Sequence, residues 1–369
     1  MTEEDTSGQV ATIAGVAPRG PYHALRVARV IDETHDARSI VLEIPDALRS
    51  LFAYEAGQFL TFRFEIDGER LVRCYSLASC PSSEGEHKVT VKRIRDGRVS
   101  NWIHDTLAAG HYVEVMRPAG LFTLRSREHP IVLFGAGSGI TPCISILKTA
   151  LATTERRVRL FYANRDEASV IFGPELDHLA ARYRERFEVV HRYDSVHGLT
   201  DEATVRACAG VDLAADFYVC GPAPFMDVVE KALRGLGVAR EHVFIERFTA
   251  PATPATGVAE SSRGAPASHE PGPRQGEAAV MLRVTLGGTT HEVACEPGQT
   301  VLAAVRRAGL EPPFACEEGY CGCCMARVRE GDVTMKANDC LDRQQLAEGW
   351  VLTCQSLPRA GVLRIEWPD

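Results

Sequence analysis

Six of the twelve cysteines fall between positions 316 and 354. Within this group, Cys316, Cys321 and Cys324 have the spacing C-x4-C-x2-C, and Cys354 follows further along the chain. Two irons need four thiolate ligands, and this spacing with a distant fourth cysteine is one that holds [2Fe–2S] clusters. The sequence therefore predicts a [2Fe–2S] cluster with Cys316, Cys321, Cys324 and Cys354 as its metal ligands.

The same segment offers other ligand choices. A structural zinc site is the main alternative, but zinc sites favour paired C-x2-C arms and do not need the four-residue spacing. Cys323 adjoins Cys324 and could replace it, although the spacing favours Cys324. Cys340 could replace Cys354 as the fourth ligand.

A second set of residues, between positions 73 and 100, could bind a flavin nucleotide. In Arg73-Cys74-Tyr75-Ser76 the guanidinium can meet a pyrophosphate, the phenol ring can lie against an isoalloxazine, and the hydroxyl can approach the flavin ring. Val91-Lys92 then leads to a glycine turn that delivers Ser100 to the start of a helix, whose free N–H groups suit a phosphate. Each motif alone is weak, but their order on one strand-rich segment indicates flavin binding. The candidates are Arg73, Tyr75, Ser76, Val91, Lys92, Gly97, Val99 and Ser100.

A glycine-rich turn at positions 135–142 is typical of a dinucleotide site. It reads Gly-Ala-Gly-Ser-Gly-Ile-Thr-Pro and lies between an apolar run and a helix-like segment. Glycines at alternate positions let the backbone approach a pyrophosphate, and the helix N-terminus adds its dipole. The candidates are Gly135, Gly137, Gly139, Thr141 and Pro142, with Thr141 near the nicotinamide or the flavin.

Three further segments supply candidates for the same nucleotide or for the flavin. Asn164-Arg165-Asp166 ends a strand where the ribose 2′ position is read; Arg165 could meet a 2′-phosphate and Asp166 would disfavour one, so NADH and NADPH both remain open. Cys220-Gly221-Pro222 ends a later strand, and the Cys220 thiol could lie beside the nicotinamide or be a buried small apolar group. Phe248 could pack near the flavin or belong to a core.

The elements that must position these residues divide the chain into parts. Residues 23–127 read as short strands with one helix near 101–108, which predicts an antiparallel β-barrel for FAD. Residues 128–248 alternate strands and helices, which predicts a doubly wound parallel sheet for NAD(P). Residues 279–369 begin with a hairpin around Gly287-Gly288 and then a helix, and we expect an α+β domain of the β-grasp type for the cluster. A disordered tail, 1–22, and a Pro- and Gly-rich flexible linker, 249–278, complete the expected organisation.

Composition excludes several classes of protein. The chain has 369 residues, 45% hydrophobic and 24% charged, as in globular multidomain proteins. A formal net charge of −8 argues against a nucleic-acid partner. No apolar run reaches the length of about 20 residues that a membrane span needs. The N-terminal segment lacks the pattern of a secretory signal, so we expect a cytoplasmic protein, in which clustered cysteines suggest metal ligation before disulfides.

Together these residues resemble the ferredoxin–NADP reductase superfamily with a C-terminal plant-type ferredoxin domain. Within it, the chain is similar to the reductase components of 3-ketosteroid 9α-hydroxylases, and phenylacetyl-CoA epoxidase reductases share the domain order. The similar segments are Asp32–Thr34, Ala37–Ser39, Gly57–Thr61, Arg73–Ser79, Val91–Arg93, Ser100–Trp102, Gly137–Pro142, Tyr162–Asp166, Val170–Gly173 and Leu352–Gln355.

The resemblance implies FAD as the flavin, NADH as the preferred donor and a separate Rieske-type terminal oxygenase as the electron acceptor. It also favours Cys354 over Cys340, because Leu352–Gln355 is similar to the corresponding ferredoxin segment. The expected electron path runs from NAD(P)H through FAD to the cluster, and no side chain needs to act as a general base. A flavin and iron–sulfur redox sensor with little turnover is the competing hypothesis from another class.

Overall fold

The computed structural model of the protein describes residues 22–210, 213–248, 280–314, 317–319, 322–338, 340–341, 343–359 and 361–368. They form two compact units: the first ends at Ile245 and omits Ala119–Leu121, and the second comprises Ala119–Leu121 and the chain from Glu246 onward. The expected linker lies outside the described residues. So does the expected tail, except Tyr22, which is the first residue of a strand.

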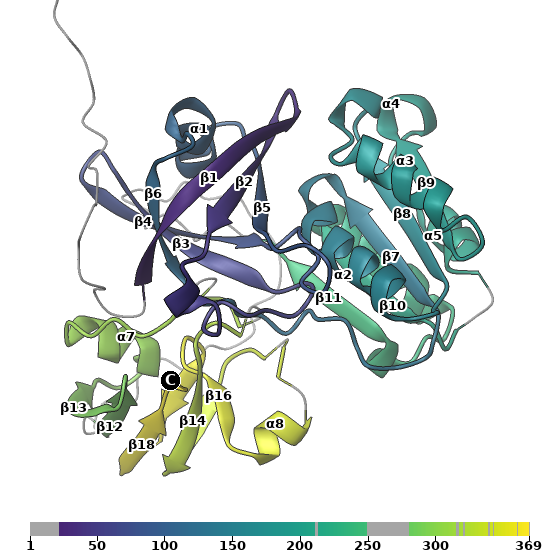
Figure 1. Ribbon diagram of the computed structural model, residues 1–369. Coiled ribbons are helices and arrows are strands. Elements are labelled where there is room, and N and C mark those ends of the chain that lie inside the picture. The colour runs from purple at the N-terminus through teal and green to yellow at the C-terminus, as the bar shows by residue number, and fades with distance from the viewer. Residues whose placement is uncertain are drawn as a thin grey trace, which may run out of the picture. The chain divides into compact units, whose positions relative to one another are not determined.

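The first unit opens with a six-stranded antiparallel sheet in the order β4-β3-β6-β1-β2-β5 (Figure 1). An isolated bridge between Leu77, just after β4, and Val89 in β5 brings the two edges of the sheet together, as in a barrel. The strands are β1 (Tyr22–Thr34), β2 (Ala37–Glu43), β3 (Phe59–Ile66), β4 (Glu69–Ser76), β5 (His87–Lys92) and β6 (Tyr112–Met116).

Alternating apolar residues of these strands fill the barrel, because successive side chains of a strand point to opposite faces. Phe62, Val89 and Val115 are among the buried residues of this core. The single α-helix of this part is α1 (Arg98–Thr106), which starts three residues earlier than expected and contributes Val99 and Ile103 to the same core. The prediction of an antiparallel barrel with one helix is confirmed.

A five-stranded sheet follows, in the order β11-β10-β7-β8-β9, and all of it except the last two residues of β11 belongs to the first unit. Strands β10, β7, β8 and β9 pair in parallel. The strands are β7 (Ile131–Ala136), β8 (Val158–Asn164), β9 (Phe187–Tyr193), β10 (Asp216–Gly221) and β11 (Val243–Arg247). The chain order reverses between β7 and β10, and open parallel sheets bind ligands at the carboxyl ends of strands flanking such a reversal.

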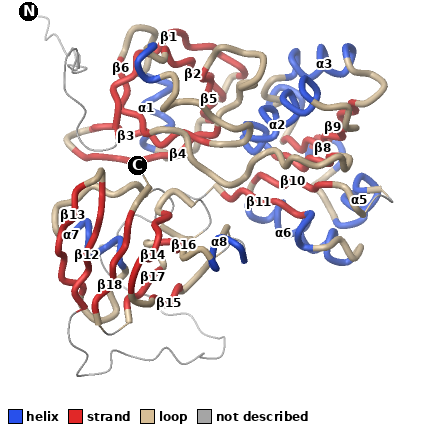
Figure 2. Tube along the Cα trace, turned by 60° about the horizontal axis from the view of Figure 1, so that its bottom comes forward, coloured by secondary structure: helices blue, strands red, loops and turns tan. Residues whose placement is uncertain are grey.

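Helices cover both faces of this sheet (Figure 2). Leu133 points into a core shared with helices α2 and α3, whereas Val132 and Phe134 point into a second core shared with α5 and α6. This alternation confirms the prediction of a doubly wound sheet. The helices are α2 (Ile140–Thr153), α3 (Gly173–Arg182), α4 (Asp194–His197), α5 (Glu202–Ala209) and α6 (Ala223–Gly235).

The second unit has a mixed five-stranded sheet in the order β13-β12-β18-β14-β16, with β12 and β18 parallel. The predicted hairpin is confirmed: β12 (Val280–Leu286) and β13 (Thr289–Cys295) pair around Gly287-Gly288, both of which have positive φ. Helix α7 (Val301–Arg307) packs against this sheet through Val301, Ala304 and Val305. The remaining elements are β14 (Met325–Glu330), β15 (Val333–Met335), α8 (Arg343–Ala347), β16 (Trp350–Leu352), β17 (Ser356–Pro358) and β18 (Val362–Glu366).

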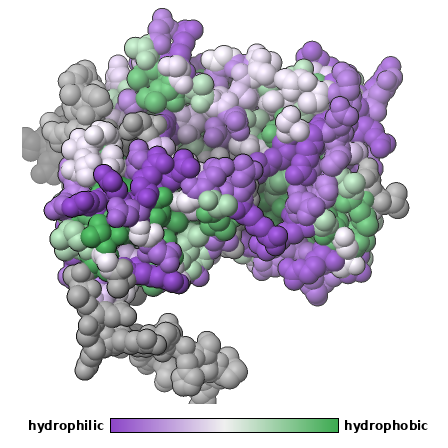
Figure 3. Space-filling model, turned by 90° about the horizontal axis from the view of Figure 1, so that it is seen from below, coloured by the Kyte–Doolittle hydropathy of each residue, from purple (hydrophilic) through white to green (hydrophobic). Residues whose placement is uncertain are grey.

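Hydrophilic side chains cover much of the face drawn in Figure 3, and hydrophobic ones form separate patches between them. Among the described residues, no helix is both long and apolar enough to cross a membrane.

Candidate functional site

The flavin candidates on β4 lie at the end of an edge strand of the barrel sheet. The Arg73 guanidinium donates to the carbonyl of its neighbour Val72 at 2.7 Å and is half-buried. The Tyr75 ring packs edge-on against Phe62, with 5.6 Å between centroids, and burial raises the pKa of its hydroxyl. Ser76 is 3% exposed, and its Oγ is buried without a hydrogen-bond partner among the described residues. A buried hydroxyl without a partner is costly, so Ser76 fits a ligand group at this strand end.

The second flavin segment contains two residues whose side chains cannot reach a ligand. Val91 and Val99 are both 1% exposed and belong to the barrel core. The expectation that their side chains bind the cofactor is therefore corrected: only their backbone groups could contact it. Ser100 lies in the first turn of α1 behind Gly97, but its hydroxyl is engaged locally, with the Ile94 N–H at 3.2 Å and the Gly97 carbonyl at 3.2 Å. Only the backbone N–H groups of this turn remain suited to a phosphate.

The glycine turn lies at the strand-order reversal of the parallel sheet. Cys220 of β10 is in register with Gly135 of β7, so the loops that follow these two strands are neighbours. The turn continues through a short 3-10 helix, Gly137–Gly139, into α2. The predicted residues of the glycine turn and of the Cys220–Pro222 segment therefore meet at the carboxyl ends of β7 and β10, where a dinucleotide is expected.

Two glycines of this turn are required for different reasons. Gly137 has φ +52°, a conformation that side chains rarely adopt. At Gly139, an added Cβ would lie 2.1 Å from the Cys220 carbonyl oxygen. By contrast, a Cβ at Gly135 would meet nothing closer than 3.7 Å. The turn is thus held close to the end of β10, which leaves backbone rather than side chains to face a ligand.

Buried side chains stabilise the glycine turn through hydrogen bonds to its carbonyl groups. The Tyr162 hydroxyl, at the end of a fully buried side chain, donates to the Gly137 carbonyl at 3.0 Å. Thr141 is 2% exposed, and its hydroxyl donates to the Ser138 carbonyl at 3.0 Å. Pro142 lies in the first turn of α2, where a missing N–H costs nothing. From the barrel, Lys92 Nζ lies 4.0 Å from the Cβ position of Gly137, so a flavin candidate and a nucleotide candidate meet.

The end of β8 carries a small polar network. The amide atoms of Asn164 are buried without hydrogen-bond partners among the described residues. The Asp166 carboxylate accepts from the Arg165 guanidinium at 3.0 Å and from the Ser169 hydroxyl at 2.5 Å. These bonds, Ser169 first, lower the pKa of Asp166. Asp166 is thus held as a carboxylate, and the charge of Arg165 is directed toward it.

The remaining nucleotide candidates differ in exposure. The Cys220 thiol is fully buried and belongs to the core under α2, whereas its carbonyl lies against Gly139. A Cβ at Gly221 would lie 2.9 Å from the side chains of Ala136 and Phe225, so only glycine fits there without a shift. Pro222 is exposed and caps α6, and Phe248 is 43% exposed.

Of the predicted cluster ligands, Cys316 and Cys321 lie outside the described residues. Cys324 and Cys354 are 2% and 6% exposed and share one small core with Leu302, Leu341 and Leu352. Cys340 packs at the edge of that core and is half-buried, and Cys323 is 7% exposed. The Cys324 carbonyl accepts the Thr353 hydroxyl at 2.9 Å, which holds the two ligand segments together.

The chemistry of this core fits a metal cluster. The neighbouring Cys354 thiol and burial both raise the pKa of Cys324, and a cation such as iron would stabilise the thiolate form of these two residues. The amide of Gln355 donates to the Cys354 sulfur at 3.6 Å and to the Glu317 carbonyl at 2.7 Å. Gly319 and Gly322 have positive φ in the loop that carries the first three cysteines. None of the described cysteines forms a disulfide.

Sequence reasoning missed Glu246 in β11. Its Oε2 is buried without a hydrogen-bond partner among the described residues, and desolvation raises the pKa of the carboxyl to about 8. Only its place near Phe248 at the end of a strand could have drawn attention to it.

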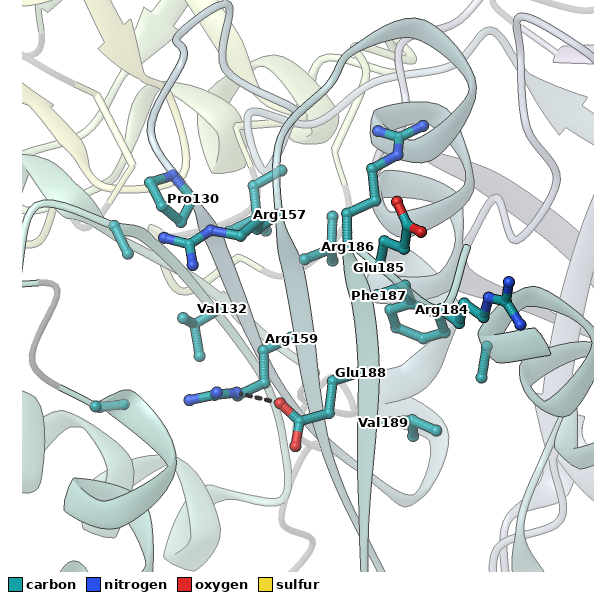
Figure 4. A pocket seen from close by; sticks show the side chains of 16 residues that line it. Pro130, Val132, Arg157, Arg159, Arg184, Glu185, Arg186, Phe187, Glu188 and Val189 are labelled. Atoms are coloured by element: carbon teal, nitrogen blue, oxygen red, sulfur yellow. Dashed lines mark hydrogen bonds and ion pairs between the residues drawn. The ribbon is translucent and has the colours of Figure 1, made fainter. Parts of the chain in front are cut away.

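A cavity of about 750 Å³ lies at the amino ends of β7, β8 and β9 (Figure 4). Arg159 and Glu188, which line it, form an ion pair at 2.9 Å. This end of the sheet is opposite to the glycine turn, so the cavity is not the nucleotide site.

Comparison with known proteins agrees with these sites. Residues 24–124 match the oxidoreductase FAD-binding domain, residues 133–231 the oxidoreductase NAD-binding domain, and residues 284–359 the 2Fe-2S iron-sulfur cluster binding domain. The chain is 43% identical over 93% of its length, and 96% of the relative's, to the ferredoxin reductase component of 3-ketosteroid-9-alpha-monooxygenase of Rhodococcus rhodochrous. It is 33% identical to one of the subunits of the 1,2-phenylacetyl-CoA epoxidase of Escherichia coli, over 91% of this chain and 95% of that one.

Among solved structures, phthalate dioxygenase reductase is similar with a TM-score of 0.58 and 25% identity, covering 95% of this chain and all of that one. The chain therefore belongs to the family of ferredoxin reductases that join an FAD-binding, an NAD-binding and a [2Fe–2S] domain. It is an oxidoreductase that uses a nicotinamide nucleotide, FAD and a [2Fe–2S] cluster.

Proposed function

We propose that this chain is the reductase component of a multicomponent oxygenase and passes electrons to a separate, Rieske-type terminal oxygenase that hydroxylates 3-ketosteroids at the 9α position. The observation that carries the proposal is the 43% identity to a 3-ketosteroid-9-alpha-monooxygenase reductase component along nearly the whole of both chains. Residues 23–127 would bind FAD, 128–248 NAD(P)H and 279–369 the cluster. We place the protein in the reducing cytoplasm, where cysteines are not expected to form disulfides, and none of the described cysteines forms one.

The flavin, once bound, supplies the conversion between hydride transfer and single-electron transfer, and the protein contributes binding and orientation. Ser76 Oγ would donate to or accept from the flavin ring, and Arg73 would exchange its bond to a backbone carbonyl for one to the pyrophosphate. The N–H groups at the start of α1 would hold phosphate oxygens.

The nucleotide would bind with its pyrophosphate over Gly137–Gly139 and its nicotinamide toward Thr141 and Cys220. NADH is the donor that the network on β8 favours. Asp166 is held ionised next to the ribose position, and a 2′-phosphate would meet this carboxylate at close range. We expect Asp166→Ala to lower the ratio of kcat/KM for NADH to kcat/KM for NADPH by at least about tenfold. This corresponds to a change of roughly 1.4 kcal/mol in relative transition-state stabilisation.

The electron path is tested with two matched cysteine variants. Cys354→Ser should remove the visible absorption of the cluster and the reduction of cytochrome c, while NADH still reduces the flavin. Cys340→Ser should retain the cluster absorption, cytochrome c reduction and flavin reduction. Cytochrome c reduction at the wild-type rate without a cluster would refute the path. Steady NADH turnover excludes a redox sensor.

Reconstitution with purified oxygenases identifies the acceptor. NADH-dependent hydroxylation of a 3-ketosteroid by a 9α-oxygenase, supported by this chain, confirms the proposed partner. Efficient coupling to a phenylacetyl-CoA epoxidase instead would assign the chain to that pathway.

A further inference from the structure

Three side chains of types that can ligate a metal meet at the amino end of the parallel sheet, opposite the end that carries the glycine turn. His129 lies in the loop before β7, Asp216 is the first residue of β10, and His242 ends a 3-10 helix (Arg240–His242) before β11. Asp216 is fully buried, and its backbone N–H donates to the Pro130 carbonyl at 2.8 Å, which fixes the start of β10 beside the His129 loop.

The three side chains converge on one oxygen. The Asp216 Oδ1 lies 3.5 Å from His242 Nδ1 and 3.9 Å from His129 Nδ1, and the possible ligand atoms of the three residues all lie within 4.8 Å of one another. Both imidazole Nδ1 atoms are buried and have no hydrogen-bond partner among the described residues. Buried polar atoms are rarely left without a partner, so something is expected to satisfy them.

The other oxygen of the carboxylate is already bound. Arg156, which is 5% exposed, donates to Asp216 Oδ2 at 2.6 Å and to the Arg125 carbonyl at 3.0 Å. An arginine on the far oxygen orients a metal-ligating carboxylate in the way that outer-shell groups do, and it leaves Oδ1 directed at the two histidines and at the partly exposed Arg127.

We propose that His129, Asp216 and His242 bind a divalent transition-metal ion, with Zn²⁺ as the best fit. Two imidazole nitrogens and one carboxylate oxygen suit zinc and leave a fourth position for water. Ligands of a tetrahedral zinc ion lie about 3.3 Å apart, given metal–ligand distances of about 2.0–2.1 Å. The 3.5 Å pair is close to this separation, and the 3.9 Å pair needs a shift of His129, a half-exposed loop residue.

The ion would join three segments that are distant in sequence: the loop before β7, the start of β10 and the turn before β11. It therefore acts on the stability of the nucleotide-binding domain, not on electron transfer.

Arg127 competes with the proposed ion for Asp216 Oδ1. Its guanidinium donates to Asp216 Oδ1 at 3.3 Å and to the Glu241 carbonyl at 3.3 Å, and its side chain is 35% exposed, so it can swing outward. A cation on Oδ1 displaces or repels this charge. Removing it by Arg127→Gln should therefore tighten zinc binding by about tenfold or more.

The test is a calorimetric titration of the full-length holoprotein with Zn²⁺, with zinc and iron counted by elemental analysis and flavin and cluster followed by their visible spectra. We expect one zinc per chain with unchanged iron, and a higher thermal midpoint. His129→Gln and His242→Gln should each weaken binding by at least about tenfold. His178→Gln, an exposed histidine of α3, is the matched control and should bind zinc like the wild type.

Three results would overturn the proposal: no zinc bound at micromolar concentration, binding that is insensitive to both histidine variants, or zinc uptake only with loss of iron. Each would leave the three residues as an ion-pair cluster around Asp216. The Arg127→Gln variant keeps the test decisive if a histidine variant folds poorly, because it should bind zinc more tightly.

Discussion

Adding a single methyl group at Gly139 should distort the glycine turn of the proposed nucleotide site. Its backbone is in the ordinary right-handed helical region, with φ −63°, so alanine is conformationally acceptable. Space is the obstacle: the added Cβ would lie 2.1 Å from the Cys220 carbonyl oxygen, 2.4 Å from its carbon and 2.7 Å from the Gly221 nitrogen. All three are backbone atoms, so no side chain can rotate away.

Gly139→Ala must therefore move the start of α2 away from the end of β10. Ordinary van der Waals contact begins at 3.4 Å, so the two backbones must separate by at least about 1 Å in a close-packed interior. Overpacking of this kind costs about 1–3 kcal/mol. The same shift widens the proposed pyrophosphate site, and misplacement by about 1 Å can cost a hundredfold in rate.

Two measurements check this prediction. Thermal unfolding should show a midpoint lowered by about 2–4 °C for each kcal/mol lost. Stopped-flow reduction of the flavin by NADH should be at least about tenfold slower at a fixed subsaturating NADH concentration. For stability, Gly135→Ala in the same turn is the matched control, because its Cβ would meet nothing within 3.7 Å. A Gly139→Ala protein with the wild-type midpoint and the wild-type rate of flavin reduction would refute the reasoning.

Three further variants test other parts of the protein. Asp216→Ala leaves the buried Arg156 guanidinium without its partner and should cost about 3–5 kcal/mol of stability, read from denaturant unfolding; a loss below about 1 kcal/mol would show that the pair is not structurally important. Ser76→Ala removes the buried hydroxyl without a partner and should weaken FAD binding several-fold, or about 1 kcal/mol, while thermal stability of the flavin-free protein stays the same or rises. The Glu246 carboxyl has a pKa raised to about 8, above its ordinary 4.5, so between these values the folded chain keeps a proton that the unfolded chain releases. The free energy of unfolding should therefore fall by up to a few kcal/mol as pH rises from about 5 to 8, at about 1.4 kcal/mol per pKa unit. Glu246→Gln should flatten this pH dependence. Parallel pH profiles of the wild type and the variant would contradict the prediction.

The sequence alone determined the three kinds of domain and the cofactors that they use. Hydrophobic period, glycine turns and cysteine spacing are local properties, and they correctly predicted the barrel, the doubly wound sheet and the Gly287-Gly288 hairpin. Phosphate binding by a strand–glycine turn–helix unit is also local, so the turn after β7 could be found without its neighbours.

Tertiary structure decided which of the predicted residues have side chains free to act. Val91 and Val99 belong to the barrel core, and the Ser100 hydroxyl is engaged by its own turn, although all three stand in motifs that suggested ligand contact. Burial depends on what packs against a strand from elsewhere in the chain, and no spacing rule contains that information.

The cluster of His129, Asp216 and His242 depends most strongly on tertiary structure. Its members are separated by long stretches of sequence and belong to no shared motif. They meet because parallel pairing of β10 with β7 brings the amino ends of distant strands together. Local sequence thus determined the elements and their chemical groups, whereas long-range strand pairing determined which of those groups became neighbours.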